Sequence, residues 1–189
     1  MALLSRWRRT AAVSLVAATT TLFGAPARAQ RALEYEVKAA FLYNFIKFVE
    51  WPPDSLRPGQ PFRVCTYRDD PFDGALERTV AGDTFEERSI VAERVSADET
   101  PGRCQILFVP QSQSANATAA IRAAGTGPVL IVGESPDFLR AGGVVNFIVD
   151  AGHVRFDVNV EGAAARRLRI SSKLLRIARS AGSQDQQER

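Results

Sequence analysis

The side chains that most often carry out chemistry are scarce in this 189-residue chain. It holds one histidine, His153, and two cysteines, Cys65 and Cys104. A protein-only zinc site needs three or four ligands arranged together, so we expect no metal site. The sequence contains no glycine-rich phosphate loop and no Gly-x-Ser-x-Gly nucleophile motif. We therefore expect no catalytic residues and no enzyme activity.

The remaining candidates for chemistry have simpler explanations. Asp69, Asp70 and Asp73 gather before a predicted helix, where aspartate commonly caps the helix or stabilises a turn. His153 follows Gly152 in a predicted turn, and no nucleophile motif accompanies it. We assign the aspartates to capping and the histidine to the surface, and we expect no cofactor.

Residues 1–29 have the pattern of a secretory signal peptide. Arg6, Arg8 and Arg9 form a basic start, an apolar run follows over residues 11–25, and Ala27 and Ala29 provide the small side chains of a cleavage site. The apolar run is shorter than the roughly 20 residues that span a bilayer. Cleavage after Ala29 is therefore expected to release an exported protein, with an uncleaved membrane anchor as the alternative.

Loss of this segment changes the charge of the protein. The whole chain has 24 basic and 21 acidic residues, and residues 1–29 hold four arginines and no acidic residue. The mature chain then has 20 basic and 21 acidic side chains, which is a net charge of about −1. This balance gives no support for a nucleic-acid partner.

Export also determines how the two cysteines are interpreted. Disulfides form and persist in oxidising compartments, so we expect a Cys65–Cys104 bridge. It would close a loop of about 40 residues, worth roughly 4 kcal/mol in the loop-entropy model. Two separately buried thiols are the alternative. A catalytic thiol would need an adjacent histidine or helix N-terminus, and neither is expected near Cys65.

Hydrophobic periodicity predicts alternating helices and strands. Helices are expected over residues 35–49, 70–80, 114–124, 135–143 and 166–179, and strands over 62–67, 89–95, 105–109 and 129–132. Residues 144–149 and 154–160 are expected to form a hairpin. This order predicts an α/β fold: a single domain over residues 30–180, with a mixed β-sheet, helices on both faces and a C-terminal β-hairpin plus helix. Residues 181–189 are expected to be a flexible tail.

The first predicted helix is apolar on most of its faces. Its charged edge is expected to consist of Glu34, Glu36, Lys38, Lys47 and Glu50. Such a helix is either buried or part of an interface. We expect core burial, with dimerisation or partner docking as the alternative.

Several ordered motifs resemble the YfiR family of bacterial periplasmic proteins. The first is YxVKAAFLYNFxKFxxWP at residues 35–52, followed by Cys65 and Cys104. FxxxGG at 138–143, VRFDVN at 154–159 and ISSKLL at 170–175 come next. The likeness covers nearly the whole mature chain. Family members can carry a second cysteine pair in the C-terminal half, which this chain lacks.

The resemblance implies regulation by contact. Members such as YfiR bind the periplasmic sensor region of an inner-membrane diguanylate cyclase and hold the enzyme inactive. An outer-membrane lipoprotein can sequester them and release the cyclase. By this resemblance we expect a periplasmic repressor that lowers cyclic di-GMP and limits biofilm formation.

The hairpin is the candidate partner site. Alternation places Val145 and Phe147 on one face, with Arg155 and Asp157 among the opposing positions. Apolar area beside charges suits a protein contact. Ordinary sheet packing and a surface Arg–carboxylate pair are the alternative for these four residues.

A periplasmic small-molecule-binding sensor is the main rival function. Such a protein holds its ligand in a pocket at the strand ends and reports it to a kinase or transporter. A ligand-dependent rise in melting temperature would favour this sensor, whereas co-purification with a membrane cyclase would favour the repressor.

Overall fold

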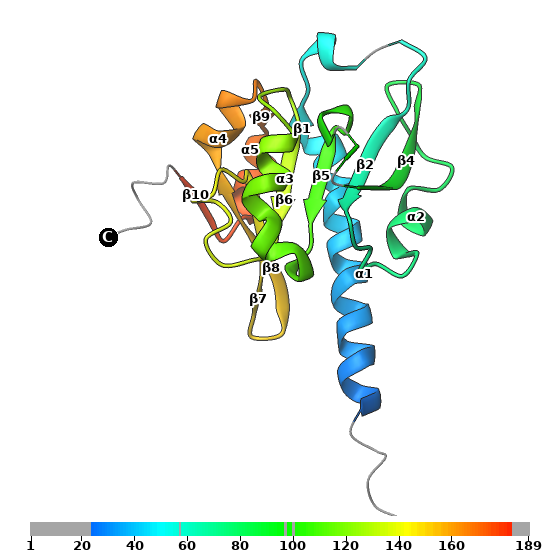
Figure 1. Cartoon of the computed structure of the whole chain (residues 1–189), viewed down its shortest axis with the longest axis vertical. Coiled ribbons are helices and arrows are strands. Elements are labelled where there is room, and N and C mark those ends of the chain that lie inside the picture. Colours follow the sequence, from blue (N-terminus) through cyan, green and yellow to red (C-terminus); the bar gives the residue numbers. More distant parts are fainter. Residues whose placement is uncertain (1–23, 57, 97, 100, 183–189) are drawn as a thin grey trace, which may run out of the picture.

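Strands and helices alternate along the chain, as the computed structural model shows for residues 24–56, 58–96, 98–99 and 101–182 (Figure 1). The helices are α1 (Gly24–Phe48), α2 (Ala75–Val80), α3 (Ala117–Ala123), α4 (Val160–Ala165) and α5 (Ser172–Ile177). The strands are β1 (Val49–Glu50), β2 (Phe62–Tyr67), β3 (Thr84–Phe85), β4 (Arg88–Val95), β5 (Ile106–Val109), β6 (Leu130–Gly133), β7 (Val145–Asp150), β8 (His153–Asn159), β9 (Arg169–Ile170) and β10 (Ser180–Gly182). Short 3-10 turns occupy Pro53–Ser55, Pro101–Arg103 and Gln111–Asn116.

The main sheet is mixed, with the strand order β10-β8-β7-β6-β5-β2-β4-β3. Strands β4, β2, β5, β6 and β7 run parallel, whereas β8 pairs antiparallel with β7. The parallel part has the order 2-1-3-4-5 of a doubly wound α/β sheet. The predicted fold class, including the C-terminal hairpin and helix, is confirmed.

Two hydrophobic cores lie on opposite faces of this sheet. Within β5, Ile106 and Phe108 belong to one core, whereas Leu107 and Val109 belong to the other. Helices α1, α2, α4 and α5 contribute side chains to the first core, and α3 contributes to the second. Helices on both faces explain why β5 and β6 are apolar at every position.

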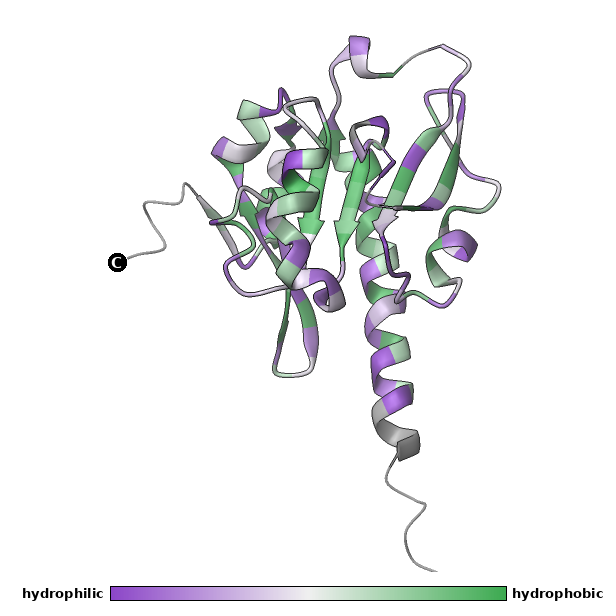
Figure 2. Ribbon diagram, viewed as in Figure 1, coloured by the Kyte–Doolittle hydropathy of each residue, from purple (hydrophilic) through white to green (hydrophobic). Residues whose placement is uncertain are grey.

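Helix α1 is the main element of the larger core. Its Phe45 is fully buried and stacks on Phe147 of β7 at 5.9 Å between ring centroids, while Phe156 of β8 meets it edge-on at 5.3 Å. The N-terminal part of α1 extends beyond the sheet and is more hydrophilic than the part over the sheet (Figure 2). Core burial, the expected role of this helix, therefore applies to its C-terminal half.

Two predicted helices are corrected by the structure. Helix α2 begins at Ala75, because Asp70 accepts a hydrogen bond from the Phe72 N–H in a turn and Gly74 adopts a positive φ of 77°. Residues 135–143 form turns instead of a helix. There the Phe138 ring fills the space beside Gly133 and Gly143, where any Cβ would come within 2.5 and 2.3 Å of the ring.

The basic segment 166–179 is also not one helix. Arg167 has a positive φ of 59°, Ile170 pairs with Val49, and α5 covers only residues 172–177. Strand β10 then runs parallel to β8, so residues 181 and 182 of the expected tail belong to the sheet. Residues 183–189, most of the expected tail, and residues 1–23 of the expected signal peptide lie outside the described residues.

Candidate functional site

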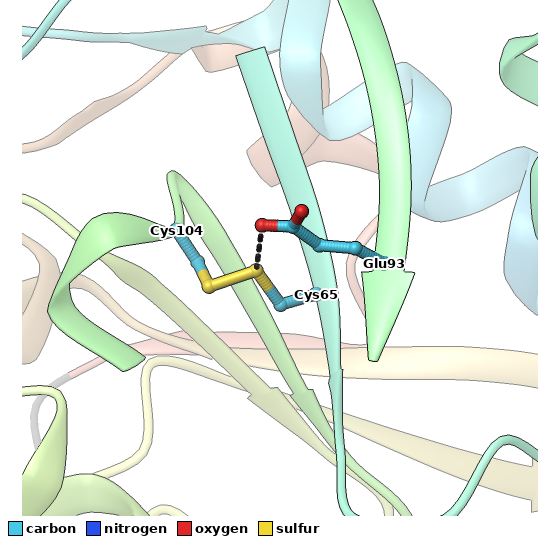
Figure 3. Close-up of side chains that lie close together, drawn as sticks. All are labelled: Cys65, Glu93 and Cys104. Atoms are coloured by element: carbon cyan, nitrogen blue, oxygen red, sulfur yellow. Dashed lines mark hydrogen bonds between the residues drawn. A yellow bond between two sulfur atoms is a disulfide. The ribbon is translucent and has the colours of Figure 1, made fainter. Parts of the chain in front are cut away.

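A disulfide joins Cys65 of β2 to Cys104, just before β5 (Figure 3). The two Cα atoms are 6.0 Å apart, and both side chains are buried in the smaller core. The expected bridge is confirmed, and the alternative of two free buried thiols is excluded.

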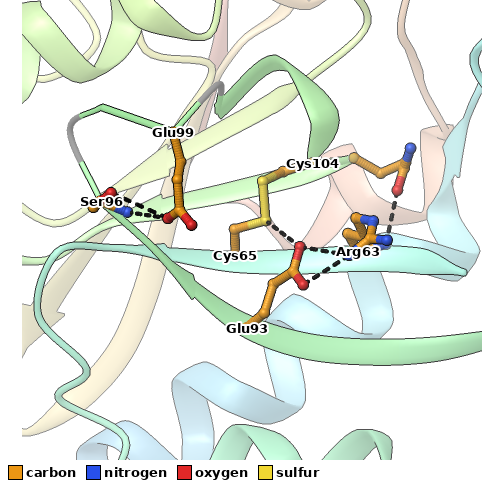
Figure 4. The surroundings of a disulfide bond; sticks show 7 residues. Arg63, Cys65, Glu93, Ser96, Glu99 and Cys104 are labelled. Carbon is orange, nitrogen blue, oxygen red and sulfur yellow. Dashed lines mark hydrogen bonds and ion pairs between the residues drawn. A yellow bond between two sulfur atoms is a disulfide. The ribbon is translucent and has the colours of Figure 1, made fainter.

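An acidic side chain lies beside the disulfide. Glu93 of β4 is the register partner of Cys65, and its Oε1 lies 3.8 Å from the Cys65 Sγ. Arg63 donates to both oxygens of Glu93 at 2.9 and 2.7 Å, which holds the carboxylate in place (Figure 4). Among the described residues, Cys65, Glu93 and Cys104 form the group whose donor atoms could meet one metal ion. Metal binding requires thiolates, which disulfide sulfurs cannot provide.

The four predicted contact residues of the hairpin have very different environments. Val145 and Phe147 are buried in the core beneath α1, with 0% and 1% exposure. Asp157 is buried as well, and only Arg155 of the four is exposed. The aromatic rings of α1 cover the hairpin face on which the first two were expected to be available. The contribution of Arg155 to partner binding stays a prediction.

Asp157 has a structural set of partners. Its Oδ1 accepts hydrogen bonds from the Nε of Arg179 at 3.0 Å and from the N–H and hydroxyl of Ser180 at 3.0 and 2.9 Å. This carboxylate raises the pKa of the Arg179 guanidinium by hydrogen bonding. Asp157 thus attaches β10 to the sheet.

A buried ionic cluster connects α1 to the end of β6. Lys38 is 2% exposed and pairs with Glu34, one turn away, and with Glu134, which directly follows β6. Glu134 also accepts hydrogen bonds from the Tyr35 hydroxyl at 2.8 Å and the Gln111 N–H at 2.7 Å. Burial, followed by the Glu134 charge, raises the pKa of Tyr35. The sequence had placed Lys38 on the charged, exposed edge of the first helix. The structure corrects this, because Lys38 is buried.

This cluster forms one wall of a cleft of about 760 Å³ between α1 and β7. Asn146 of β7 also lines the cleft and is 9% exposed. Its Oδ1 is buried and has no hydrogen-bond partner within the described part of the chain. The cleft lies at the carboxyl ends of parallel strands, where doubly wound sheets commonly bind ligands.

Beyond the cleft, α1 and the hairpin form two projections that we call the fork (Figure 1). The fork consists of residues 30–38 of α1 and residues 148–154 of the hairpin, and both contribute to the lining of the cleft. It carries three of the large exposed apolar side chains: Leu33 at 57%, Val37 at 37% and Val149 at 53%. Leu33 and Val37 continue, at helical spacing, the stripe of Phe41, whose ring packs on Phe156 at 5.3 Å.

The groups tested for catalysis stay isolated from one another. His153 is exposed at the hairpin turn, where its Nδ1 lies 3.0 Å from the Ala151 carbonyl oxygen. Asp69 accepts hydrogen bonds from Ser112 at 2.7 Å and Gln113 at 2.6 Å, which lower its pKa. Asp69 thereby ties the end of β2 to the turn after β5.

Comparison with known families decides the assignment. A model of the YfiR/HmsC-like family matches residues 35–179. The chain belongs to this family. At family level, these proteins are periplasmic regulators of cyclic di-GMP signalling rather than enzymes. Among curated proteins, none is similar enough to count as a match.

Solved structures support the fold of this YfiR/HmsC-like protein. A conserved domain protein from Vibrio cholerae has 10% identity and a TM-score of 0.54 over 78% of this chain. The ABC domain in complex with L-Trp from Streptococcus pneumoniae has 10% identity and a TM-score of 0.51 over 79% of this chain. This chain spans 60% of the length of each. At such identity the likeness concerns the fold alone.

The family match includes the disulfide, the hairpin, and Lys38 and Glu134 of the ionic cluster, but not residues 24–34 of α1, to which Glu34 belongs. Within the part of the chain that the structure describes, no helix combines the length and apolar character needed to cross a bilayer.

Proposed function

We propose that this protein is a periplasmic repressor of an inner-membrane diguanylate cyclase, and that it binds the periplasmic region of that enzyme through the fork. The family match supports a regulator of cyclic di-GMP signalling. The observation that carries the contact site is the exposure of Leu33, Val37 and Val149 on two adjacent projections.

The composition of the fork suits a protein partner. Protein interfaces typically combine an apolar centre with a polar, solvent-accessible rim. The apolar side chains of the fork are accompanied by Arg31 and Glu34 on α1 and by Asp150 on the hairpin, and Arg155 directly follows the fork. Arg155 and Asp150 form an exposed pair at 3.7 Å, which another protein can displace at little cost.

Repression requires that the protein distinguish two states of the cyclase. A partner that binds the active and inactive states equally shifts no equilibrium, whatever its affinity. The fork is built from a helix and a two-stranded hairpin that share a packed aromatic core, so its two projections have a fixed spacing. A rigid fork selects the cyclase conformation whose periplasmic surface matches that spacing. An outer-membrane lipoprotein that occupies the same surface would release the enzyme.

The binding experiment uses the mature chain, residues 30–189, and the periplasmic domains of the inner-membrane diguanylate cyclases encoded in the same genome. Val149→Asp should weaken binding by about tenfold or more, because it places a charge in the apolar centre of the contact. Ile177→Asp is the matched control, since Ile177 is equally exposed on α5, outside the fork. Failure of every cyclase domain to bind, or equal binding by parent and Val149→Asp, would contradict the proposal.

A small-molecule sensor is a second candidate, and the cleft favours it. No described residue donates a hydrogen bond to the Asn146 Oδ1, and the cleft is large enough for a metabolite. A ligand that raises the melting temperature of the parent, but not of Asn146→Ala, would support the sensor.

A further inference from the structure

A second cleft lies at the opposite edge of the sheet from the fork. Its volume is about 500 Å³, and its walls come from the residues just before β2, β5 and β6. Four arginines line it, namely Arg63, Arg88, Arg103 and Arg167, together with one acidic residue, Asp54. We call this cleft the arginine pocket. Doubly wound sheets usually bind ligands at the carboxyl ends of their strands, which here is the opposite edge of the sheet.

The protein neutralises only part of this positive charge. Arg167 donates to Asp54 at 2.9 Å, and this bond lowers the pKa of Asp54. Arg63 is held by Glu93 beside the disulfide. Arg103 makes no direct ion pair or side-chain hydrogen bond with any residue that the structure describes, and its charge helps to lower the pKa of Glu99, which does not line the pocket. Its neighbour Cys104, fixed by the disulfide, lines the same pocket.

Arg88 is held in place by backbone groups. Its Nη2 donates to the Leu56 carbonyl at 3.0 Å, and its Nη1 donates to the Glu86 carbonyl at 2.9 Å. The nearest carboxylate, that of Glu86, is 3.5 Å away and exposed. The Arg88 Nε is buried and has no partner in the described chain. An unpartnered buried cationic donor is costly to the protein, and a bound anion would offset that cost.

We propose that the arginine pocket binds a small multivalent oxyanion, of the phosphate-ester or polycarboxylate type. Arg88 and Arg103 provide the charge that no carboxylate of the pocket neutralises, and Arg63 and Arg167 complete the walls. Planar guanidinium groups match phosphate and carboxylate oxygens in paired hydrogen bonds, which favours these anions over halides. This ligand site is additional to the proposed binding of a cyclase and does not depend on it.

The test measures binding of inorganic phosphate and of citrate to the mature protein by calorimetry and thermal shift, at constant ionic strength. Both anions, or one of them, should bind saturably and raise the melting temperature, while monovalent acetate should not. Binding of citrate alone assigns a polycarboxylate ligand, and binding of phosphate alone assigns a phosphate ester.

Three variants locate the site. Arg103→Gln should weaken anion binding by about tenfold, and it should fold like the parent because Arg103 is exposed and makes no direct ion pair with a described residue. Arg88→Gln should weaken anion binding more than Arg103→Gln does. Arg140→Gln is the matched control, since Arg140 is exposed and lies outside the pocket. The proposal is overturned if neither phosphate nor citrate binds, if acetate binds as well as whichever of the two does bind, or if Arg103→Gln and Arg140→Gln behave alike.

Discussion

The Cys65–Cys104 disulfide stabilises the smaller core, because it joins the central strand β2 to the segment that leads into β5. Replacement by Cys65→Ser should lower the stability of the oxidised protein by about 4 kcal/mol, the loop-entropy value for a loop of about 40 residues. For a chain of this size the melting temperature should fall by roughly 10 °C. Calorimetric melting of the exported protein measures this change.

The single variant leaves Cys104 as a free thiol, so the double variant Cys65→Ser with Cys104→Ser is the control for that thiol. It should melt like the single variant. Parent protein treated with a reductant should approach both. If Cys65→Ser melts at the parental temperature, the bridge contributes nothing to stability and the entropy argument fails for this chain.

Lys38 is the second residue whose removal should be costly. Its ammonium is the cation between two carboxylates, and Glu134 is nearly as buried as Lys38. Lys38→Met leaves the Glu134 charge without its cation, and breaking such a buried pair costs about 3–5 kcal/mol. Urea unfolding measures the loss, with the exposed Lys173→Met as the control.

Adding Glu134→Gln to Lys38→Met should restore much of this stability, because the uncompensated charge is then gone. Equal stabilities of Lys38→Met and the parent would mean that the carboxylates find other partners.

These two clusters differ in how far the sequence could predict them. In an exported chain with two cysteines, each can pair only with the other. The bridge could therefore be predicted from the composition and the expected compartment. Lys38 and Glu134 are 96 residues apart and come from a helix and a strand end. No local pattern brings them together, although a glutamate directly after a fully apolar strand marks the carboxyl edge of a sheet.

Among the elements, β10 depends on a single carboxylate. Asp157 accepts from Arg179 and from both donors of Ser180, so it fixes the start of β10 beside β8. Asp157→Asn removes the charge-assisted part of these bonds. The amides of residues 180–182 should then exchange hydrogen about tenfold faster, while those of β7 stay protected.

Hydrogen exchange followed by mass spectrometry resolves this difference. Asp150→Asn, at the exposed hairpin turn, is the matched control and should leave the exchange of β10 unchanged. Loss of protection throughout β7 and β8 in Asp157→Asn would show instead that the carboxylate supports the whole hairpin.

The strands were better predicted than the helices for a physical reason. Continuous apolar runs such as β5 and β6 have no stable alternative to the centre of a covered sheet. The segment 166–179 has helical periodicity, yet Ile170 pairs with Val49, and Ser180, directly after the segment, pairs with Asp157, so the helix is limited to residues 172–177. Tertiary pairing overrides local propensity there. The same effect hides Val145 and Phe147, whose alternation could not reveal that α1 covers them.

At the scale of the whole molecule, the sheet separates two surfaces with different character. The fork, at the carboxyl edge, is apolar with paired charges around it. The arginine pocket, at the opposite edge, is polar and carries an excess of positive charge. A partner on the fork and an anion in the pocket can therefore occupy the protein together.

The compartment is the property of the whole molecule on which the proposed repression depends. Deletion of the gene should raise cellular cyclic di-GMP by about twofold or more, because the cyclase loses the partner that holds its inactive state. The full-length chain should reverse the rise. A version without residues 1–29 should not, since it stays in the cytoplasm, across the inner membrane from the periplasmic region of the cyclase.

The same complementation test also examines the fork. A full-length Val149→Asp chain should fail to reverse the rise, whereas full-length Ile177→Asp should reverse it. Complementation by the version without residues 1–29 would contradict periplasmic action, and full activity of Val149→Asp would remove the fork from the contact while leaving repression intact.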